Sequence, residues 1–202
     1  MRTYIDRIPY QGIACWPGDT SFEHQENAWE TVRVGAVTMS LHTGTHIDAP
    51  RHLVSKSCSV DGIPDSTLCG TATVIDARGV EALTADMFEG ISTQRVLVRT
   101  DAWIDSSNFP LSFPLLTQAA ATMLASRGVV LFGIDLPSVD AVDSKDLPIH
   151  HVLMNAGIII CEGLSFDTGN ICAGEVELMI VPFVIHGADA APARAWIENI
   201  SR

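Results

Sequence analysis

Segments with the composition of β-strands outnumber segments with a helical pattern, and this imbalance constrains the fold of the chain more than any other feature. Six segments are rich in β-branched and other apolar residues, at positions 32–41, 71–76, 95–99, 129–134, 157–161 and 175–185. They do not alternate strictly with helices, as a regular doubly wound fold requires. We therefore expect an α/β domain with a mixed sheet and few helices.

The expected helices are recognised by the residues at their ends. Thr117 is a suitable N-cap for a helix over residues 118–127, and Gly128 follows at the position where glycine commonly ends a helix. Pro192 is suited to the start of a last helix over residues 193–200. A shorter helix is expected after Thr84, ending at Gly90.

Length and composition indicate one folded domain over residues 1–202. The chain has 202 residues, of which 47% are hydrophobic and 18% charged, so it can form a sizeable core and is not of the disordered class. We find no internal repeat and no linker that would divide it. The formal net charge of -12 opposes binding to phosphate backbones and anionic membranes. We expect a small-molecule substrate and no nucleic-acid or membrane partner.

The sequence also indicates a cytoplasmic protein. The first residues lack the apolar stretch of a signal peptide, and no apolar run approaches the roughly 20 residues needed to cross a bilayer. None of the five cysteines is spaced as Cys-x-x-Cys: they are Cys15, Cys58, Cys69, Cys161 and Cys172. This pattern argues against a zinc ribbon, thioredoxin chemistry and a disulfide framework, and it favours reduced thiols.

The strongest chemical signal is the run His42-Thr43-Gly44-Thr45-His46-Ile47-Asp48, which follows the first strand candidate. If the chain stays extended through this run, His42, His46 and Asp48 project to one side, because side chains alternate along a strand. Gly44 then leaves room between them. Imidazole nitrogen with carboxylate oxygen is a ligand set for Zn²⁺, Mn²⁺ or Fe²⁺. The alternative is a loop with two solvated histidines, but Asp48, and His52 four residues further on, favour a metal site.

Further ligands must come from distant parts of the chain. Glu162 follows the apolar segment 157–161, and a carboxylate at the end of a buried strand is costly unless it is paired or coordinated. A position in solvent at the strand end is the alternative. His150 and His151 are both candidates, and spacing does not distinguish between them.

The segment from His42 to His52 resembles the signature of the cyclase-like metal-dependent hydrolases. The chain matches this family in order over nearly its whole length, through Trp16-Pro17-Gly18-Asp19, residues 131–140, Asp143-Ser144-Lys145, His150-His151, Glu162-Gly163-Leu164 and residues 173–178. The blocks Pro137-Ser138-Val139-Asp140 and His150-His151 narrow the resemblance towards the formamidases of the family.

The resemblance implies a site with two metal ions per chain. One ion would be held by His42, His46 and Asp48, and the second by His150, with Asp48 and Glu162 bridging the two. Zinc is the expected metal, and manganese is an alternative. The implied fold is a single α/β domain of the swivelling β/β/α type, and the implied assembly is a homodimer.

Two residues outside this ligand set match functional positions of the family. His52 corresponds to a proton-transfer histidine, and Trp16 to a residue that lines the substrate pocket. Without the resemblance, Trp16 would be assigned to surface packing in a loop. The other tryptophans, Trp29, Trp103 and Trp196, are assigned to packing or an oligomer contact.

The activity implied by the resemblance is hydrolysis of N-formyl-L-kynurenine to L-kynurenine and formate, in tryptophan degradation. A family hydrolase that opens a cyclic amide or lactone such as isatin is the first alternative, because the metal motif is common to both. A non-catalytic metal-binding protein is the second. The chain departs from the family pattern at Leu53, Asp101 and Leu136. We expect these residues to line the pocket or to contact the residues that do, so that they affect the choice of substrate more than the chemistry.

Overall fold

The computed structural model describes residues 2–166, 171 and 173–200. Its α-helices are α1 (Asp65–Leu68), α2 (Gln118–Ser126) and α3 (Pro148–Asn155), and its 3-10 helices are η1 (Pro50–His52), η2 (Val60–Gly62) and η3 (Ala85–Phe88). The strands are β1 (Arg2–Tyr4), β2 (Glu23–Trp29), β3 (Val32–Thr38), β4 (His46–Asp48), β5 (Cys69–Asp76), β6 (Ala82–Leu83), β7 (Arg95–Arg99), β8 (Leu115–Leu116), β9 (Leu131–Ile134), β10 (Ile159–Glu162), β11 (Gly174–Pro182) and β12 (Ala190–Asn199).

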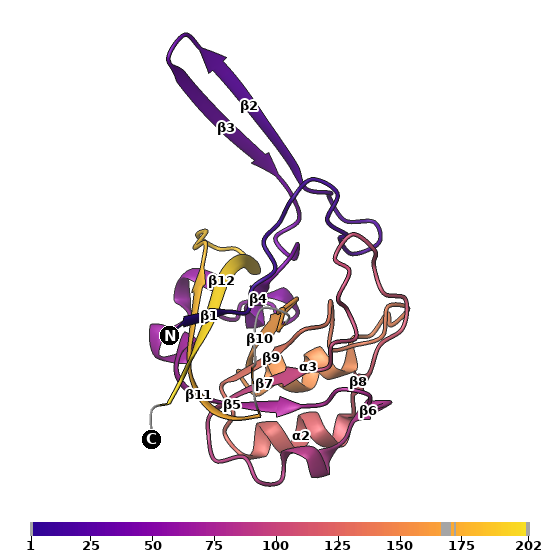
Figure 1. Ribbon diagram of the computed structural model, residues 1–202. Coiled ribbons are helices and arrows are strands. Elements are labelled where there is room, and N and C mark those ends of the chain that lie inside the picture. The colour runs from indigo at the N-terminus through magenta and orange to yellow at the C-terminus, as the bar shows by residue number, and fades with distance from the viewer. Residues whose placement is uncertain (1, 167–170, 172, 201–202) are drawn as a thin grey trace.

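A mixed sheet forms the body of the protein, with the strand order β1-β12-β11-β5-β7-β9-β10-β4 (Figure 1). The neighbours β5–β7, β7–β9 and β9–β10 are parallel, and the other neighbours are antiparallel. Strand β12 also pairs with β4, with Ala190 opposite Asp48 and Pro192 opposite His46, so the sheet closes on itself. The expected α/β fold with a mixed sheet and few helices is confirmed.

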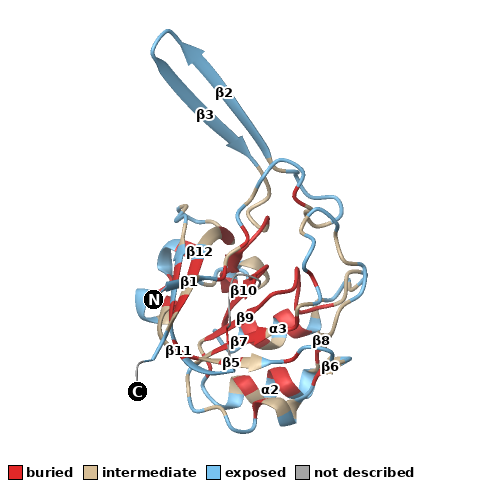
Figure 2. Ribbon diagram, in the orientation of Figure 1, coloured by how far each residue is buried: buried red, intermediate tan, exposed pale blue. Residues whose placement is uncertain are grey.

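Hydrophobic cores lie on both faces of this sheet. Successive residues of β7 alternate between them, because Leu97 packs in one core while Val96 and Val98 pack in the other. The second core lies against α2 and α3, which contribute Leu124 and Leu153. Figure 2 shows buried residues along the central strands and on these two helices. The central strands are therefore packed on both faces.

Strands β2 and β3 form an antiparallel hairpin that projects away from the sheet (Figure 1), and every residue of both strands is exposed (Figure 2). Trp29 lies opposite Val32 near the tip, and these side chains are exposed to 60% and 56%. Val34 lies two residues further along and is 48% exposed. Residues two apart share a face, so the three form an apolar strip. An isolated two-stranded hairpin is at best marginally stable in water, and an apolar strip on it is suited to contact with another surface.

The helix predicted over residues 193–200 is wrong, because this segment belongs to strand β12. Ala195 and Ile197 are buried and alternate with the more exposed Trp196 and Glu198, which is the period of a strand. The segment pairs along its length with β11 and at its end with β1. This pairing and burial outweigh a local signal as weak as a single proline at the start of a segment.

The other predicted elements are present. Each of the six strand candidates contains a strand, with boundaries shifted by a few residues. The Thr117 side chain caps α2 by accepting a hydrogen bond from the Ala120 backbone N–H at 3.3 Å, and Gly128 follows with φ +72°. The short segment after Thr84 is the 3-10 helix η3. Helix α3, which begins at Pro148, was not predicted.

No helix in the described part of the chain is long and apolar enough to cross a membrane. Cys15, Cys58, Cys69 and Cys161 are free thiols, whereas Cys172 lies outside the described residues.

Candidate active site

Three of the candidate ligands lie on one face of the sheet, on the paired strands β4 and β10. The antiparallel register places Glu162 opposite His46 and Cys161 opposite Ile47. Because Ile47 and Cys161 point into one core, alternation directs His46, Asp48 and Glu162 to the other face. All three ligand candidates are buried, at 3% exposure or less. The alternative position of Glu162, in solvent at the strand end, is therefore wrong.

The chain before His46 is not extended, contrary to the sequence prediction. Residues 41–45 form turns and bends, and Gly44 has φ +71°, a conformation that favours glycine. This turn approaches a second loop so closely that a Cβ on Gly163 would overlap the Gly44 carbonyl oxygen. Thr45 Oγ1 fastens the two segments by donating to the Gly163 carbonyl at 2.5 Å. His42 therefore reaches the site from a turn beside β4 and not from the strand itself.

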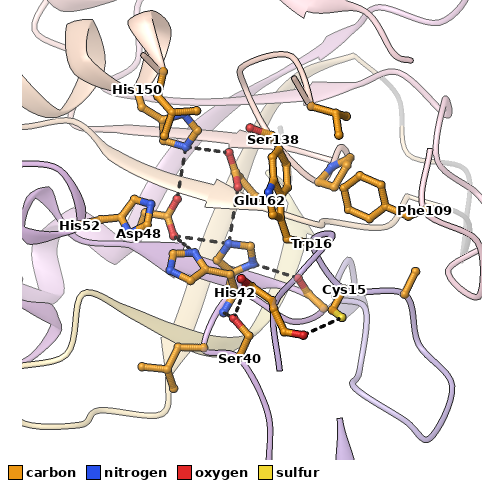
Figure 3. A pocket seen from close by; sticks show the side chains of 18 of the residues that line it. Cys15, Trp16, Ser40, His42, Asp48, His52, Phe109, Ser138, His150 and Glu162 are labelled. Carbon is orange, nitrogen blue, oxygen red and sulfur yellow. Dashed lines mark hydrogen bonds and ion pairs between the residues drawn. The ribbon is translucent and has the colours of Figure 1, made fainter. Parts of the chain in front are cut away.

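The structure brings the five predicted ligands together in two overlapping groups (Figure 3). In the first, Asp48 Oδ1 lies 3.0 Å from His42 Nδ1 and 3.4 Å from His46 Nε2. In the second, His150 Nε2 lies 3.7 Å from Asp48 Oδ2 and 3.3 Å from Glu162 Oε1. His46 Nε2 is also 3.5 Å from Glu162 Oε2, which links the groups. Within each group, the potential ligand atoms all lie within 4.8 Å of one another.

Unsatisfied buried atoms at this place fit a metal centre. Among the described residues, His46 Nε2 and both carboxylate oxygens of Asp48 are buried without a hydrogen-bond partner. Buried polar atoms are costly when they are left unsatisfied, so three of them side by side need a common partner. Imidazole nitrogens and carboxylate oxygens are the usual protein ligands of Zn²⁺. The donor set and the unsatisfied atoms therefore both fit a divalent metal ion.

Helix α3 directs His150, and not the neighbouring His151, into the site. His150 is 4% exposed, whereas His151 is exposed on the outer side of the helix. Asp140 orients the His150 ring, since its Oδ2 accepts hydrogen bonds from His150 Nδ1 at 2.7 Å and from the His150 backbone N–H at 2.9 Å. Its Oδ1 accepts from the Ile149 backbone N–H at 3.0 Å. Asp140 thus anchors the first turn of α3 and leaves His150 Nε2 directed at Asp48 and Glu162.

The buried ionisable groups of the site shift one another's pKa values. Burial by itself lowers the pKa of His42, but the Asp48 carboxylate, assisted by Asp189, raises that pKa to about 10. Burial is likewise outweighed at His46, where Asp48 raises the pKa to about 9. The pKa of Asp48 is held well below its usual range, because His42 and His46 outweigh the effect of burial. In the absence of a metal ion, both histidines therefore carry protons at neutral pH, and these protons must leave when a metal binds.

A cavity of about 540 Å³ opens beside the ligand cluster. His52 and Trp16 both line it, which places the two remaining predicted site residues next to the candidate metal ligands. The His52 ring centroid is 4.4 Å from that of His42. Trp16 contacts Phe109 edge to face at a centroid distance of 5.4 Å, and Trp103 also lines the cavity. Trp103, assigned from the sequence to packing or an oligomer contact, is therefore also part of the cavity wall.

Sequence reasoning missed two carboxylates of the site. Asp140 lies in the Pro137-Ser138-Val139-Asp140 block, so its motif was recognised although its contact with His150 was not. Asp189 lies at the cavity wall and accepts a hydrogen bond from His52 Nδ1 at 3.1 Å. Nothing in its local sequence marks it, because it reaches the site through the pairing of β12 with β4.

The three departures from the family pattern lie outside the cavity lining of the described chain. Leu136 is fully buried, and Leu53 packs against the same hydrophobic core. Asp101 forms an ion pair with Arg99 at 2.9 Å. The two leucines therefore contribute to packing, and Asp101 contributes to a local ion pair.

A comparison with protein families identifies the family of the chain. A family model described as "Putative cyclase" matches residues 8–141. The chain belongs to this cyclase family. A relative with a curated name, a kynurenine formamidase of Bacillus cereus, is 37% identical over 196 residues, covering 93% of this chain and 92% of its own length.

Solved structures show the same fold. One described as a potential metal-dependent hydrolase with cyclase activity superposes with a TM-score of 0.85 at 26% identity, over 100% of this chain and 99% of the other. An isatin hydrolase A from Labrenzia aggregata, bound to benzyl benzoate, has a TM-score of 0.83 over 100% of this chain and 94% of its own, at 20% identity. At that identity, the likeness to isatin hydrolase concerns the fold alone.

Proposed function

We propose that the protein is a metal-dependent amidohydrolase that converts N-formyl-L-kynurenine and water to L-kynurenine and formate. The observation that carries the proposal is the convergence of five ligand residues, namely His42, His46, Asp48, His150 and Glu162, beside a cavity with an aromatic wall. The kynurenine formamidase relative, which this chain matches over 93% of its length, supports the choice of substrate.

The two overlapping ligand groups support a site for two Zn²⁺ ions per chain. His42, His46 and Asp48 would hold one ion, and His150 would hold the other, with Asp48 and Glu162 reaching both. Mn²⁺ would also accept this donor set. When bound, such ions supply Lewis acidity, which activates water at neutral pH and polarises a carbonyl oxygen.

We assign to His52 the transfer of protons in this reaction. Its ring lines the cavity and is 26% exposed, so it is accessible to a substrate bound there. The aryl amine is a poor leaving group as an anion and must leave protonated. His52 therefore accepts a proton from the attacking water and donates one to the amide nitrogen as the bond to the formyl carbon breaks.

The aromatic wall fits the aryl ring of the substrate. Trp16 and Phe109 meet edge to face, and Trp103 lies 6.3 Å from Phe109 between ring centroids. Aromatic side chains contribute large apolar area with a defined orientation, which is suited to holding a planar ring. Trp16 is the residue that we assign to substrate binding, since it lines the cavity on which the metal ligands also open.

The alternatives find less support. A cyclic amide such as isatin would use the same ligands, but the isatin hydrolase structure is only 20% identical to this chain. A non-catalytic metal-binding protein needs neither a proton carrier nor a cavity beside the metal ligands, and this chain has both in His52 and the adjoining space.

We also propose that the protein is a homodimer and that it is located in the cytoplasm. The exposed apolar strip of the β2–β3 hairpin, with Trp29, Val32 and Val34, supports a homodimer in which this strip is covered. The free thiols of Cys15, Cys58, Cys69 and Cys161 support a location in the reducing cytoplasm.

The proposed activity is tested by incubating the purified, zinc-loaded protein with N-formyl-L-kynurenine and following kynurenine absorbance and formate release. We expect turnover that is lost after chelation and restored by added zinc. Absence of turnover in the zinc-loaded protein would refute the proposed function.

A further inference from the structure

Asp189 is a carboxylate of the cavity wall that belongs to neither of the two ligand groups proposed above. It directly precedes β12, whose first residue, Ala190, pairs with Asp48 on β4. The Ala49 backbone N–H donates to the Asp189 carbonyl at 2.9 Å, which extends this pairing by one residue. The sheet therefore fixes the backbone of Asp189 beside the chain that leads from Asp48 to His52.

One oxygen of Asp189 contacts two histidine rings. Asp189 Oδ2 lies 3.1 Å from His52 Nδ1 and 3.3 Å from His42 Nε2. An ionised carboxylate is only an acceptor, so each ring must place an N–H on the nitrogen that faces it. Once His42 has lost its second proton to bind a metal ion, its lone pair would therefore be on Nδ1, the atom that lies 3.0 Å from Asp48 Oδ1 in the first ligand group. His52 has its lone pair on Nε2, the nitrogen that remains for proton exchange in the cavity.

We propose that Asp189 is a positioning residue that fixes the tautomers and ring orientations of His52 and His42 together. The proposal rests on the proposed function, because it assigns to Asp189 the support of the proton carrier and of one metal ligand. A carboxylate that holds one ring nitrogen of a histidine determines which nitrogen is free for chemistry. Here a single oxygen does so for two adjacent rings, so loss of the carboxylate affects both.

A simple structural role is distinguishable from this positioning role. The Asp189 side chain is 44% exposed, so its truncation leaves no buried cavity, and its backbone contact with Ala49 is unaffected. The variants Asp189→Ala and Asp189→Asn should therefore fold. Asp76→Asn is a matched control, because Asp76 pairs with Arg78 at the surface, outside the cavity lining.

The test combines ring-nitrogen NMR of the zinc-loaded protein with steady-state kinetics on N-formyl-L-kynurenine. In the wild type and in Asp76→Asn, long-range ¹H–¹⁵N spectra should show His52 protonated on Nδ1 and His42 protonated on Nε2. In Asp189→Ala, the His52 proton should be redistributed between its two nitrogens. The value of kcat should fall by about 10- to 100-fold, the usual effect of losing such an orienting partner, while KM changes less than about twofold. Asp189→Asn should lie between wild type and Asp189→Ala.

Two outcomes would overturn the proposal. An unchanged His52 tautomer in Asp189→Ala would show that the ring is held by other contacts. Loss of zinc from Asp189→Ala at saturating zinc, with the His42 and His52 tautomers unchanged, would show that Asp189 is itself a ligand. If the wild type fails to hydrolyse N-formyl-L-kynurenine, the proposed function is wrong, but the NMR comparison still decides the role of Asp189.

Discussion

Glu162 on β10 and His46 on β4 are direct cross-strand partners, and Glu162 Oε2 lies 3.5 Å from His46 Nε2. Backbone pairing holds this relationship, since the same register continues through Cys161 opposite Ile47 inside a core. A substitution of either side chain therefore leaves the partner in place. Single variants at the site consequently report on its chemistry more than on its architecture.

We predict two zinc ions per chain in the wild type and a lower zinc content in Glu162→Gln. The amide removes the negative charge that offsets two dications, so zinc affinity should fall by more than about tenfold and activity should fall with it. The measurement is elemental analysis after equilibration with zinc and desalting. Glu177→Gln is the control, because Glu177 is exposed on β11 and accepts a hydrogen bond from Thr71. Full activity with one zinc ion or fewer would contradict the two-ion site.

His52→Ala should keep its zinc and its fold but lose turnover. Loss of general acid–base catalysis typically lowers kcat by about 10² to 10⁴, equivalent to about 3–5 kcal/mol, with little change in KM. Steady-state kinetics with parallel zinc analysis measure both quantities, and His151→Ala on the outer side of α3 is the control. Zinc loss would make His52 a ligand, and unchanged kcat would make it a packing residue. Each result excludes the proton-carrier role.

Zinc affinity should rise between about pH 7 and pH 10, because a histidine must lose its proton before it binds a metal. Without metal, the pKa is about 10 for His42 and about 9 for His46, so both rings are protonated at neutral pH. Titration calorimetry in buffers of different ionisation enthalpy counts the released protons. An affinity that is independent of pH, with no proton release, would contradict this coupling.

The same shifts give the metal-free protein a predicted pH dependence of stability. The pKa values of His42 and His46 are raised in the folded state, so their contribution is complete below the unfolded value of about 6.5. It is lost as the pH rises through about 9 to 10. The Tm of the metal-free protein should therefore fall over this range, while zinc-loaded protein is protected. A Tm of the metal-free protein that stays constant over this pH range would contradict the raised pKa values of the two histidines.

Much of the site was predictable because its ligands lie in a short motif. The run from His42 to Asp48 supplied three ligand candidates, and Glu162 was marked by a buried apolar segment before it. The sequence predicted that these side chains project to one side of an extended segment. This was partly wrong, because Gly44 turns the chain and the segment before His46 is not extended. The three side chains of the motif nevertheless lie together, because the turn at Gly44 brings His42 beside β4.

What the sequence did not reveal depends on contacts between distant segments. Residues 193–200 have a local helix signal, yet β12 pairs with β11, β1 and β4, and such long-range pairing is not encoded in local propensity. Asp189 enters the cavity only because of that strand. Likewise, the partnership of Asp140 with His150 requires the position of α3, which no local pattern predicted.

The hairpin strip predicts dimer formation. Trp29→Ser combined with Val34→Ser should weaken self-association by at least about tenfold, because buried aromatic residues dominate most interfaces. Light scattering over a range of concentrations measures the assembly, and Leu111→Ser, at a side chain that is 80% exposed elsewhere, is the control. A wild type that is monomeric at every concentration would contradict the homodimer.

The identity of the substrate can be decided by comparing kcat/KM for N-formyl-L-kynurenine and isatin on one zinc-loaded preparation. We expect a preference for N-formyl-L-kynurenine of at least about tenfold, which corresponds to about 1.4 kcal/mol of transition-state discrimination. Equal or faster hydrolysis of isatin would contradict it.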